Sequence, residues 1–168
     1  MIDEAYEFAE RHFKENDIRR KYTNEPYMRH PQEVAFMVRG VGGSDAMVMA
    51  ALLHDTVEDT PVTIGQIYDK FGADVGFLVQ CLTDITVPSD GNRAKRKRIE
   101  AQRLSMCSNA VKTIKLADLI SNSESIFKYD KKFAPVYAQE MFYLLTVLRG
   151  GNSILLNKAR QIICDWEG

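Results

Sequence analysis

A short polar stretch in the segment "ALLHDTVEDT" interrupts what would otherwise read as a buried helix. After the apolar run 50–53 come four side chains of the kinds that bind metals or transfer protons: His54, Asp55, Glu58 and Asp59. A carboxylate beside buried surface loses solvation that only a proton, a cation or good hydrogen bonds can replace. Helical spacing places Glu58 one turn after His54, and Asp59 one turn after Asp55. One interpretation is half of a metal site followed by two carboxylates that handle water; the other is a pair of carboxylates that cap the next loop.

Further metal ligands would have to come from other elements, and the sequence has only three histidines. His30 stands in "EPYMRHPQEVAFMV", directly before the proline that opens a helix and near the apolar face of that helix. It can be either a ligand or an ordinary capping residue. His12 lies among charged residues, where a solvated surface role is expected.

Asp118 interrupts the apolar side of the segment "AVKTIKLADLISNSES". A charged aspartate on a buried helix costs several kcal/mol unless it has a partner. Lys115 could supply a salt bridge, and a metal ion is the alternative. Asn122 follows Asp118 by one helical turn and Ser125 follows by about one more, so the helix carries a polar stripe typical of a pocket wall.

Two imidazoles and two carboxylates would together form a mixed nitrogen and oxygen ligand set: His30, His54, Asp55 and Asp118. Such a set suits Mn²⁺, Fe²⁺ or Mg²⁺ with positions open for water, and it differs from a cysteine-rich structural zinc site. A carboxylate one turn further along could then accept a proton from the activated water.

The bulk composition is that of an ordinary soluble globular protein. The chain has 168 residues, which suits one domain over residues 1–168, and a formal net charge of -1, which argues against a general attraction to nucleic acid. Its apolar runs are too short for a membrane span, and its acidic N-terminal segment does not resemble a signal peptide. Three cysteines without CxxC spacing indicate reduced thiols and a cytoplasmic protein.

The hydrophobic period is helical almost throughout, and no segment alternates as a strand would. Thr63 and Ser44 are expected to be N-caps, and Gly72 is expected to end the helix that begins after Thr63. We therefore predict an all-α fold, a single compact bundle of about eight to ten helices. The predicted helices lie near 3–16, 31–39, 45–56, 64–71, 73–84, 92–105, 109–127, 133–148 and 153–165.

Three of these segments resemble the HD-domain (p)ppGpp hydrolase family, which comprises the hydrolase domain of RelA/SpoT proteins and small Mesh1-like alarmone hydrolases. "EPYMRHPQEVA" is similar to its first-histidine motif, "ALLHDTVEDT" to its HD-x-x-ED-T signature and "TIKLADLISN" to its "KLAD…N" motif. A lone HD dipeptide is a weak signal, but three motifs in order at similar spacing are specific. The resemblance covers residues from about 5 to 160 and implies an HD-domain helical bundle.

The resemblance also assigns roles to individual residues. It implies one Mn²⁺ per chain, with Fe²⁺, Mg²⁺ or Zn²⁺ as alternatives, on His30, His54, Asp55 and Asp118. Glu58 and Asp59 would orient or deprotonate the attacking water. Asn122, Ser125 and Tyr137 match positions that face the nucleotide. The implied reaction is hydrolysis of the 3′-pyrophosphate of ppGpp or pppGpp, which yields pyrophosphate and GDP or GTP.

A basic run in "NRAKRKRIEAQR" could contact the phosphates of such a substrate, with Lys97 and Arg93 the two residues expected to do so. On its own, such a run is usually the solvated face of a helix. A nucleic-acid module built on this run would be a further hypothesis, and it would require steeply salt-dependent binding.

The sequence departs from the family at the residue that stacks on guanine. The family has an arginine there, whereas an ungapped count places Lys21 at that position, and Arg20 only after a one-residue shift. Lysine lacks a planar face. Two alternatives therefore remain: a phosphohydrolase that acts on another nucleotide, for example at the 2′-phosphate of NADPH, and a non-catalytic nucleotide sensor. The sequence also leaves a homodimer open.

Overall fold

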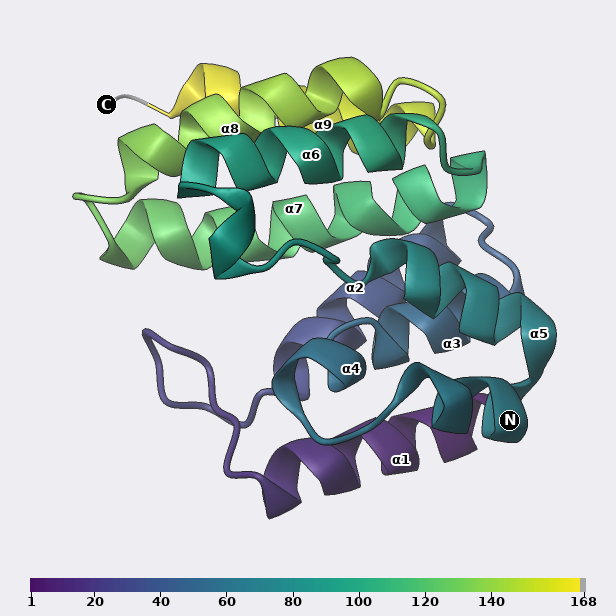
Figure 1. Cartoon of the computed structure of the whole chain (residues 1–168). Coiled ribbons are helices and arrows are strands. Elements are labelled where there is room, and N and C mark those ends of the chain that lie inside the picture. Colours follow the sequence, from purple (N-terminus) through teal and green to yellow (C-terminus); the bar gives the residue numbers. More distant parts are fainter. Residues whose placement is uncertain (167–168) are drawn as a thin grey trace. The chain divides into compact units, whose positions relative to one another are not determined.

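The apolar periodicity of the sequence produces helices along the whole of the described chain. The computed structural model describes residues 1–166, which form helices and no β-strand, and Figure 1 labels the α-helices. These are α1 (Ile2–Glu15), α2 (Arg29–Gly40), α3 (Asp45–Leu53), α4 (Thr56–Asp59), α5 (Ile64–Leu82), the 3₁₀ turn η1 (Pro88–Asp90), α6 (Arg93–Ser105), α7 (Asn109–Tyr129), α8 (Ala134–Val147) and α9 (Ser153–Asp165). The predicted all-α class is confirmed.

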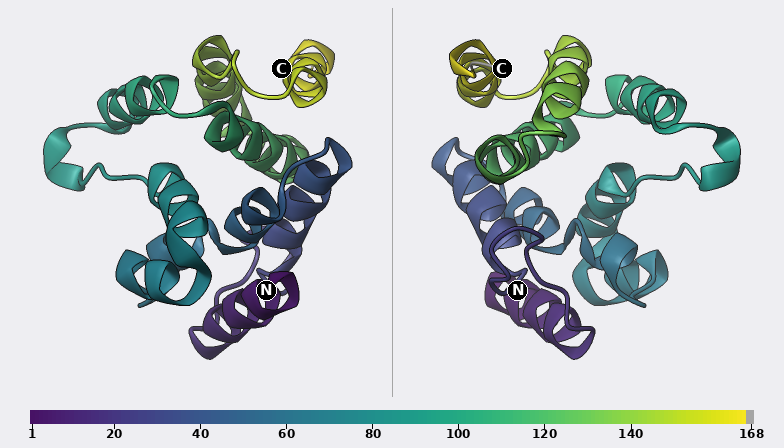
Figure 2. Two further views of the ribbon diagram at one scale, coloured as in Figure 1. Left: turned by 90° about the vertical axis from the view of Figure 1, so that its right-hand side faces the viewer. Right: turned by 90° about the vertical axis from the view of Figure 1, so that its left-hand side faces the viewer.

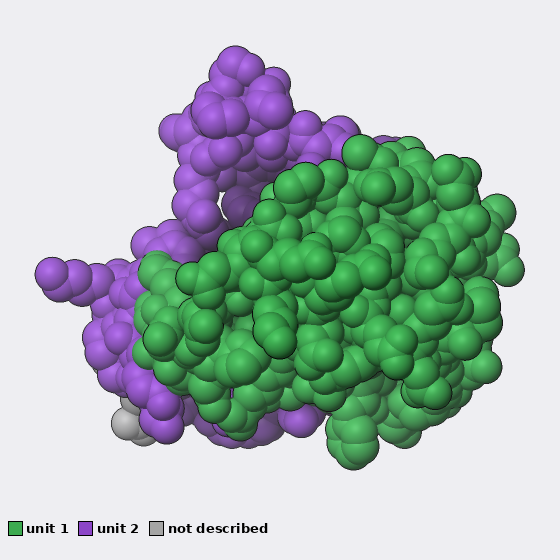
Figure 3. Space-filling model, turned by 90° about the horizontal axis from the view of Figure 1, so that it is seen from below, with its two compact units in different colours: residues 1–83 green, residues 84–168 purple. Residues whose placement is uncertain are grey.

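The helices divide into two units, residues 1–83 and residues 84–168, which are coloured separately in Figure 3. In unit 1, α3 packs against α1, α2 and α5. Its residues from Val48 to Leu53 are all buried, because neighbours surround the helix and no polar face is needed. This apolar helix leads directly into His54.

In unit 2, α7 packs against α8 and α9, and α8 also packs against α6 (Figure 2). Helix α7 is buried along most of its length, from Val111 to Ser123. Asp118 is therefore a buried carboxylate, with only 5% of its surface exposed. No helix among the described residues combines the length and the apolar character that a bilayer span requires.

The predicted helix boundaries are confirmed at the two expected caps. The Ser44 hydroxyl accepts a hydrogen bond from the backbone N–H of Met47 at 3.3 Å. Thr63 and Gln66 form a reciprocal capping box at the start of α5. Gly72 adopts φ 84° and ψ 174° and interrupts the helical backbone within α5, which agrees with the expected helix end.

One predicted helix is wrong in detail. The segment 45–56 was expected to be continuous, but α3 ends at Leu53 and α4 begins at Thr56. The Thr56 hydroxyl donates to the Leu53 carbonyl at 2.6 Å and so competes with the backbone for that acceptor. The resulting break places His54 and Asp55 at a junction between two helices.

Candidate functional site

A cluster of two histidines and one aspartate forms in unit 1. His30 comes from the first turn of α2, while His54 and Asp55 lie at the junction of α3 and α4. The Nε2 atoms of His30 and His54 lie 3.5 Å and 3.2 Å from the same carboxylate oxygen, Oδ2 of Asp55. One ligand atom from each residue lies within 4.8 Å of the others. The structure thus brings together three of the four predicted metal ligands.

The backbone fixes which nitrogen of His54 faces this cluster. Its Nδ1 lies 2.8 Å from the carbonyl oxygen of Ala51, one turn earlier in α3. A carbonyl oxygen can only accept, so Nδ1 carries a proton, and Nε2 is the nitrogen that can offer a lone pair to a metal ion when the ring is neutral. This second hydrogen bond is the arrangement that metal-binding histidines commonly show.

Asp55 is the centre of the cluster. Tyr27, in the loop before α2, donates its hydroxyl to Asp55 Oδ2 at 2.7 Å. Burial by itself would raise the pKa of the Asp55 carboxyl, but the charge and hydrogen bonds of His54 and His30 together outweigh burial and hold that pKa far below its ordinary value. Asp55 is therefore ionised, and its negative charge lies beside both imidazoles.

These donors fit a divalent cation. Two imidazole nitrogens and one carboxylate oxygen are ligands that Mn²⁺, Fe²⁺ and Zn²⁺ accept, and three protein ligands leave positions open for water and substrate. Both histidines are nearly fully buried, whereas Asp55 is partly accessible.

Glu58 and Asp59 lie on α4, immediately after the cluster. The backbone N–H of Asp59 donates to the Asp55 carbonyl at 3.0 Å, so the predicted one-turn spacing is confirmed. Although Asp59 is at the surface, neighbouring groups partly desolvate its carboxyl. This desolvation, together with the charge of Asp55, raises the pKa of Asp59. A carboxylate with a raised pKa is a stronger base toward water.

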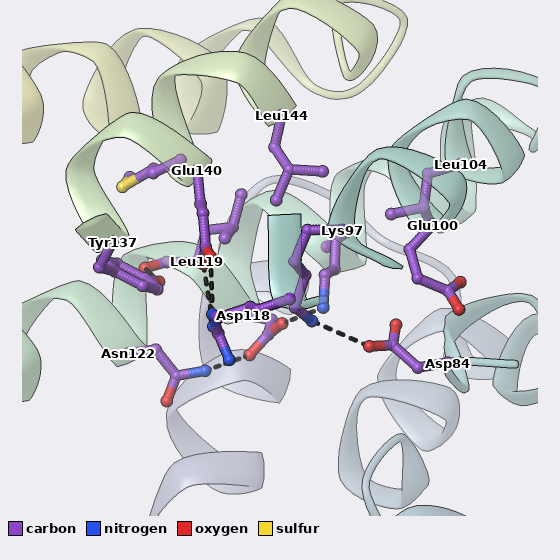
Figure 4. A pocket seen from close by; sticks show the side chains of 13 residues that line it. Asp84, Lys97, Glu100, Leu104, Asp118, Leu119, Asn122, Tyr137, Glu140 and Leu144 are labelled. Atoms are coloured by element: carbon purple, nitrogen blue, oxygen red, sulfur yellow. Dashed lines mark hydrogen bonds and ion pairs between the residues drawn. The ribbon is translucent and has the colours of Figure 1, made fainter. Parts of the chain in front are cut away.

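Asp118 lies in unit 2, in a polar pocket of about 140 Å³ that Figure 4 shows. Its Oδ2 accepts a hydrogen bond from Lys115 at 2.7 Å, and its Oδ1 accepts one from Asn122 at 2.7 Å. The expected salt bridge with Lys115 and the polar stripe toward Asn122 are therefore both present. Asp118 belongs to a different unit from the three clustered ligands.

The same pocket contains three more of the predicted substrate-binding residues: Arg93, Lys97 and Tyr137. Arg93 forms an ion pair with Glu140, and Lys97 forms one with Asp84 at 2.9 Å. The Tyr137 hydroxyl donates to the Leu119 carbonyl at 3.1 Å. The structure thus joins the basic run on α6 to α7 and α8 through one pocket.

The other predicted substrate-binding residues lie elsewhere. Ser125 donates its hydroxyl to the Asn122 carbonyl at 3.2 Å and is not among the residues that line the pocket. Arg20 and Lys21 lie in the loop between α1 and α2 of unit 1, where the Lys21 ammonium lies 4.9 Å from the ring centre of Tyr22. Their assignment to the substrate stays a prediction.

The sequence motifs did not indicate two candidate functional residues, Tyr27 and Glu140. Tyr27 carried a signal, since it lies three residues before His30 in a motif-like segment, but its contact with Asp55 spans 28 residues. Glu140 contacts Arg93 across 47 residues. It lies about one turn after Tyr137 on α8, and that spacing was the only signal in the sequence that could have indicated it.

Comparisons with known proteins find similar sequences over most of the chain. A family model described as "HD domain" matches residues 5–152. The guanosine-3′,5′-bis(diphosphate) 3′-pyrophosphohydrolase MESH1 of Xenopus tropicalis is 36% identical over 174 residues, which cover 98% of this chain and 94% of that protein. The MESH1 of Homo sapiens is 41% identical over 123 residues, which cover 71% of this chain and 65% of that protein.

A solved structure is also similar over almost the whole chain. It is that of a metazoan ortholog of SpoT that hydrolyzes ppGpp and plays a role in starvation responses. The two folds superpose with a TM-score of 0.87 at 27% sequence identity, and the match covers 97% of this chain and 93% of the other.

Proposed function

This chain belongs to the HD-domain family, and we propose that it hydrolyses the 3′-pyrophosphate of guanosine 3′,5′-bispyrophosphate, ppGpp or pppGpp, to release pyrophosphate and GDP or GTP. The observation that carries the proposal is the cluster of His30, His54 and Asp55, which offers a buried metal site. This site occurs in a chain 36% identical to a protein named for this reaction. We propose further that residues 1–168 act as one HD domain with one metal ion.

The proposed ligands are His30, His54, Asp55 and Asp118. A divalent cation, Mn²⁺ in the first instance, would supply positive charge to the phosphate oxygens and lower the pKa of the attacking water. Fe²⁺, Mg²⁺ and Zn²⁺ suit the same donors. Asp118 joins this set on the resemblance of its "KLAD" segment to the family motif, and its burial supports a role that a surface aspartate would not have.

Glu58 and Asp59 act on the water in this proposal. Glu58 accepts a proton as the water oxygen bonds to the phosphorus attached to O3′ and the P–O3′ bond breaks; O3′ takes up a proton from solvent water, and Glu58 then returns its own proton to solvent. The raised pKa of Asp59, caused by desolvation and by the charge of Asp55, supports a part in holding that water or its proton.

The polar pocket of unit 2 supports binding of the phosphates. It offers Arg93, Lys97 and Lys115 as cations and Asn122 and Tyr137 as uncharged polar groups. Each of these cations also forms an ion pair with a carboxylate, and this contact holds the cationic side chain in position. The proposed roles of Ser125, Arg20 and Lys21 rest on the resemblance alone.

Product analysis tests the proposal. Purified protein would be incubated with ppGpp and Mn²⁺, with and without EDTA, and the nucleotides and pyrophosphate quantified chromatographically. We expect GDP and pyrophosphate in equal amounts, abolished by EDTA and restored by added Mn²⁺. Parallel reactions with GTP and NADPH measure selectivity. Protein that has bound Mn²⁺ but leaves ppGpp intact would contradict the proposal.

A further inference from the structure

We infer that Glu140 is a positioning residue: it holds Arg93 so that one edge of the guanidinium is presented to two oxygens of a substrate phosphate group. This inference rests on the proposed function, because it assigns the binding pocket of unit 2 to the phosphates. It adds a residue that the motifs do not contain, and it explains why a carboxylate lines a pocket for an anion.

The contact between the two side chains is bidentate. Arg93 Nε donates to Glu140 Oε1 at 2.7 Å, and Arg93 Nη2 donates to Glu140 Oε2 at 2.9 Å. The guanidinium also lies over the ring of Phe133, 4.9 Å from its centre. A planar group held at one edge and over one face has little freedom left to rotate.

Three of the five N–H groups of Arg93 remain for a ligand. A guanidinium has five N–H groups, and Glu140 takes the one on Nε and one on Nη2. Both N–H groups of Nη1 and the second of Nη2 have no hydrogen-bond acceptor among the described residues. These two nitrogens form a second edge that matches two oxygens of one phosphate.

Arg93 is accessible to such a ligand, whereas its partner is more enclosed. The exposed fraction of the side chain is 49% for Arg93 and 17% for Glu140. Lys97 and Lys115, the other cations of the pocket, are ammonium groups that form ion pairs with Asp84 at 2.9 Å and with Asp118 at 2.7 Å. An ammonium acts as a point charge without a fixed edge, so directional recognition falls to Arg93.

Because Glu140 is negatively charged, its two possible roles predict opposite changes in phosphate affinity when the carboxylate is removed. The pocket is lined by four carboxylates and three cations: Asp84, Glu100, Asp118 and Glu140 against Arg93, Lys97 and Lys115. If Glu140 acted only as a nearby negative charge, its removal would improve binding of a phosphate. If Glu140 positions Arg93, its removal weakens binding, because the guanidinium is then free to rotate out of register.

The experiment is a double-mutant cycle on Glu140→Gln and Arg93→Ala, with KM and kcat for ppGpp as the readout. We expect Glu140→Gln to raise KM by about 5- to 20-fold while kcat stays within about twofold, since a charged hydrogen-bonded pair is lost and the water-handling residues are untouched. In the Arg93→Ala background the same change should leave KM unaltered within error. The dissociation constant for inorganic pyrophosphate, measured by calorimetry, should weaken in parallel and needs no turnover.

A matched control is Asp45→Asn, which removes the carboxylate of another arginine ion pair, Arg39 Nη2 to Asp45 Oδ1 at 2.6 Å, in unit 1. We expect no change in KM. An unchanged or lowered KM in Glu140→Gln would overturn the inference, as would an equal rise in KM with Arg93 already removed. Absence of ppGpp hydrolysis by the wild-type protein would instead contradict the proposed function, and the pyrophosphate affinities would then decide the role of Glu140.

Discussion

At the scale of single residues, Asp55 organises the candidate metal site. Its Oδ2 accepts a hydrogen bond from the Tyr27 hydroxyl and lies close to the Nε2 atoms of His30 and His54. Three side chains from two segments therefore converge on one carboxylate. Residue types and spacing in the sequence indicated both histidines and Asp55 as candidate ligands, and the structure brings them together. They could not predict Tyr27, because a contact across 28 residues depends on how the loop before α2 packs.

Glu58→Gln tests the assignment of the base. The change keeps the size of the side chain and removes its ability to accept a proton, so turnover of ppGpp should fall by about 10²- to 10⁴-fold while metal content is unchanged. Steady-state kinetics and elemental analysis of the same preparation measure both. Asp69→Asn, at another exposed carboxylate, serves as the control and should behave as the wild type does. Normal turnover in Glu58→Gln would mean that another group is the base.

At the scale of elements, local signals predicted most helix ends and failed where side chains compete with the backbone. Thr63, Ser44 and Gly72 occupy the positions that their conformational preferences indicate. The break between α3 and α4 was not predicted, since it depends on a hydrogen bond from the Thr56 hydroxyl to the Leu53 carbonyl. That break matters for the candidate site, because it places His54 and Asp55 at the end of a buried helix.

Two glycines of α5 should respond in opposite directions to the same substitution. Gly72 has φ 84° and ψ 174°, a conformation that is essentially restricted to glycine. Gly72→Ala should therefore lower the free energy of unfolding by about 1–3 kcal/mol, although a Cβ there would meet no atom within 4 Å.

Gly65 is the matched control for that prediction. It lies in the first turn of α5, and a Cβ would make only an ordinary contact with Thr63 Oγ1 at 3.8 Å. Gly65→Ala should raise the free energy of unfolding by up to about 1 kcal/mol. Denaturant titrations measure both values. A Gly72→Ala protein as stable as the wild type would show that the backbone there is not restricted to glycine.

At the scale of the whole molecule, the sequence predicted the helical class and the family, and the comparisons confirm both. It predicted less about the pocket of unit 2. The polar stripe from Asp118 to Asn122 followed from helical spacing, whereas the pairing of Arg93 with Glu140 and of Lys97 with Asp84 joins residues from separate segments. The hydrophobic periodicity of a single segment cannot predict which side chains of two separate segments will pair.

The central proposal is that one metal ion, with His30, His54, Asp55 and Asp118 as its ligands, is required for hydrolysis of ppGpp. The most direct measurement is metal content per chain, determined together with ppGpp turnover, for the wild type, His54→Ala and Asp118→Asn. Circular dichroism would establish that each variant is folded. We predict about one equivalent of metal in the active wild type, and a joint loss of metal and turnover in both variants. A variant that has lost the metal yet still hydrolyses ppGpp, or an Asp118→Asn protein with full metal content and turnover, would contradict the claim.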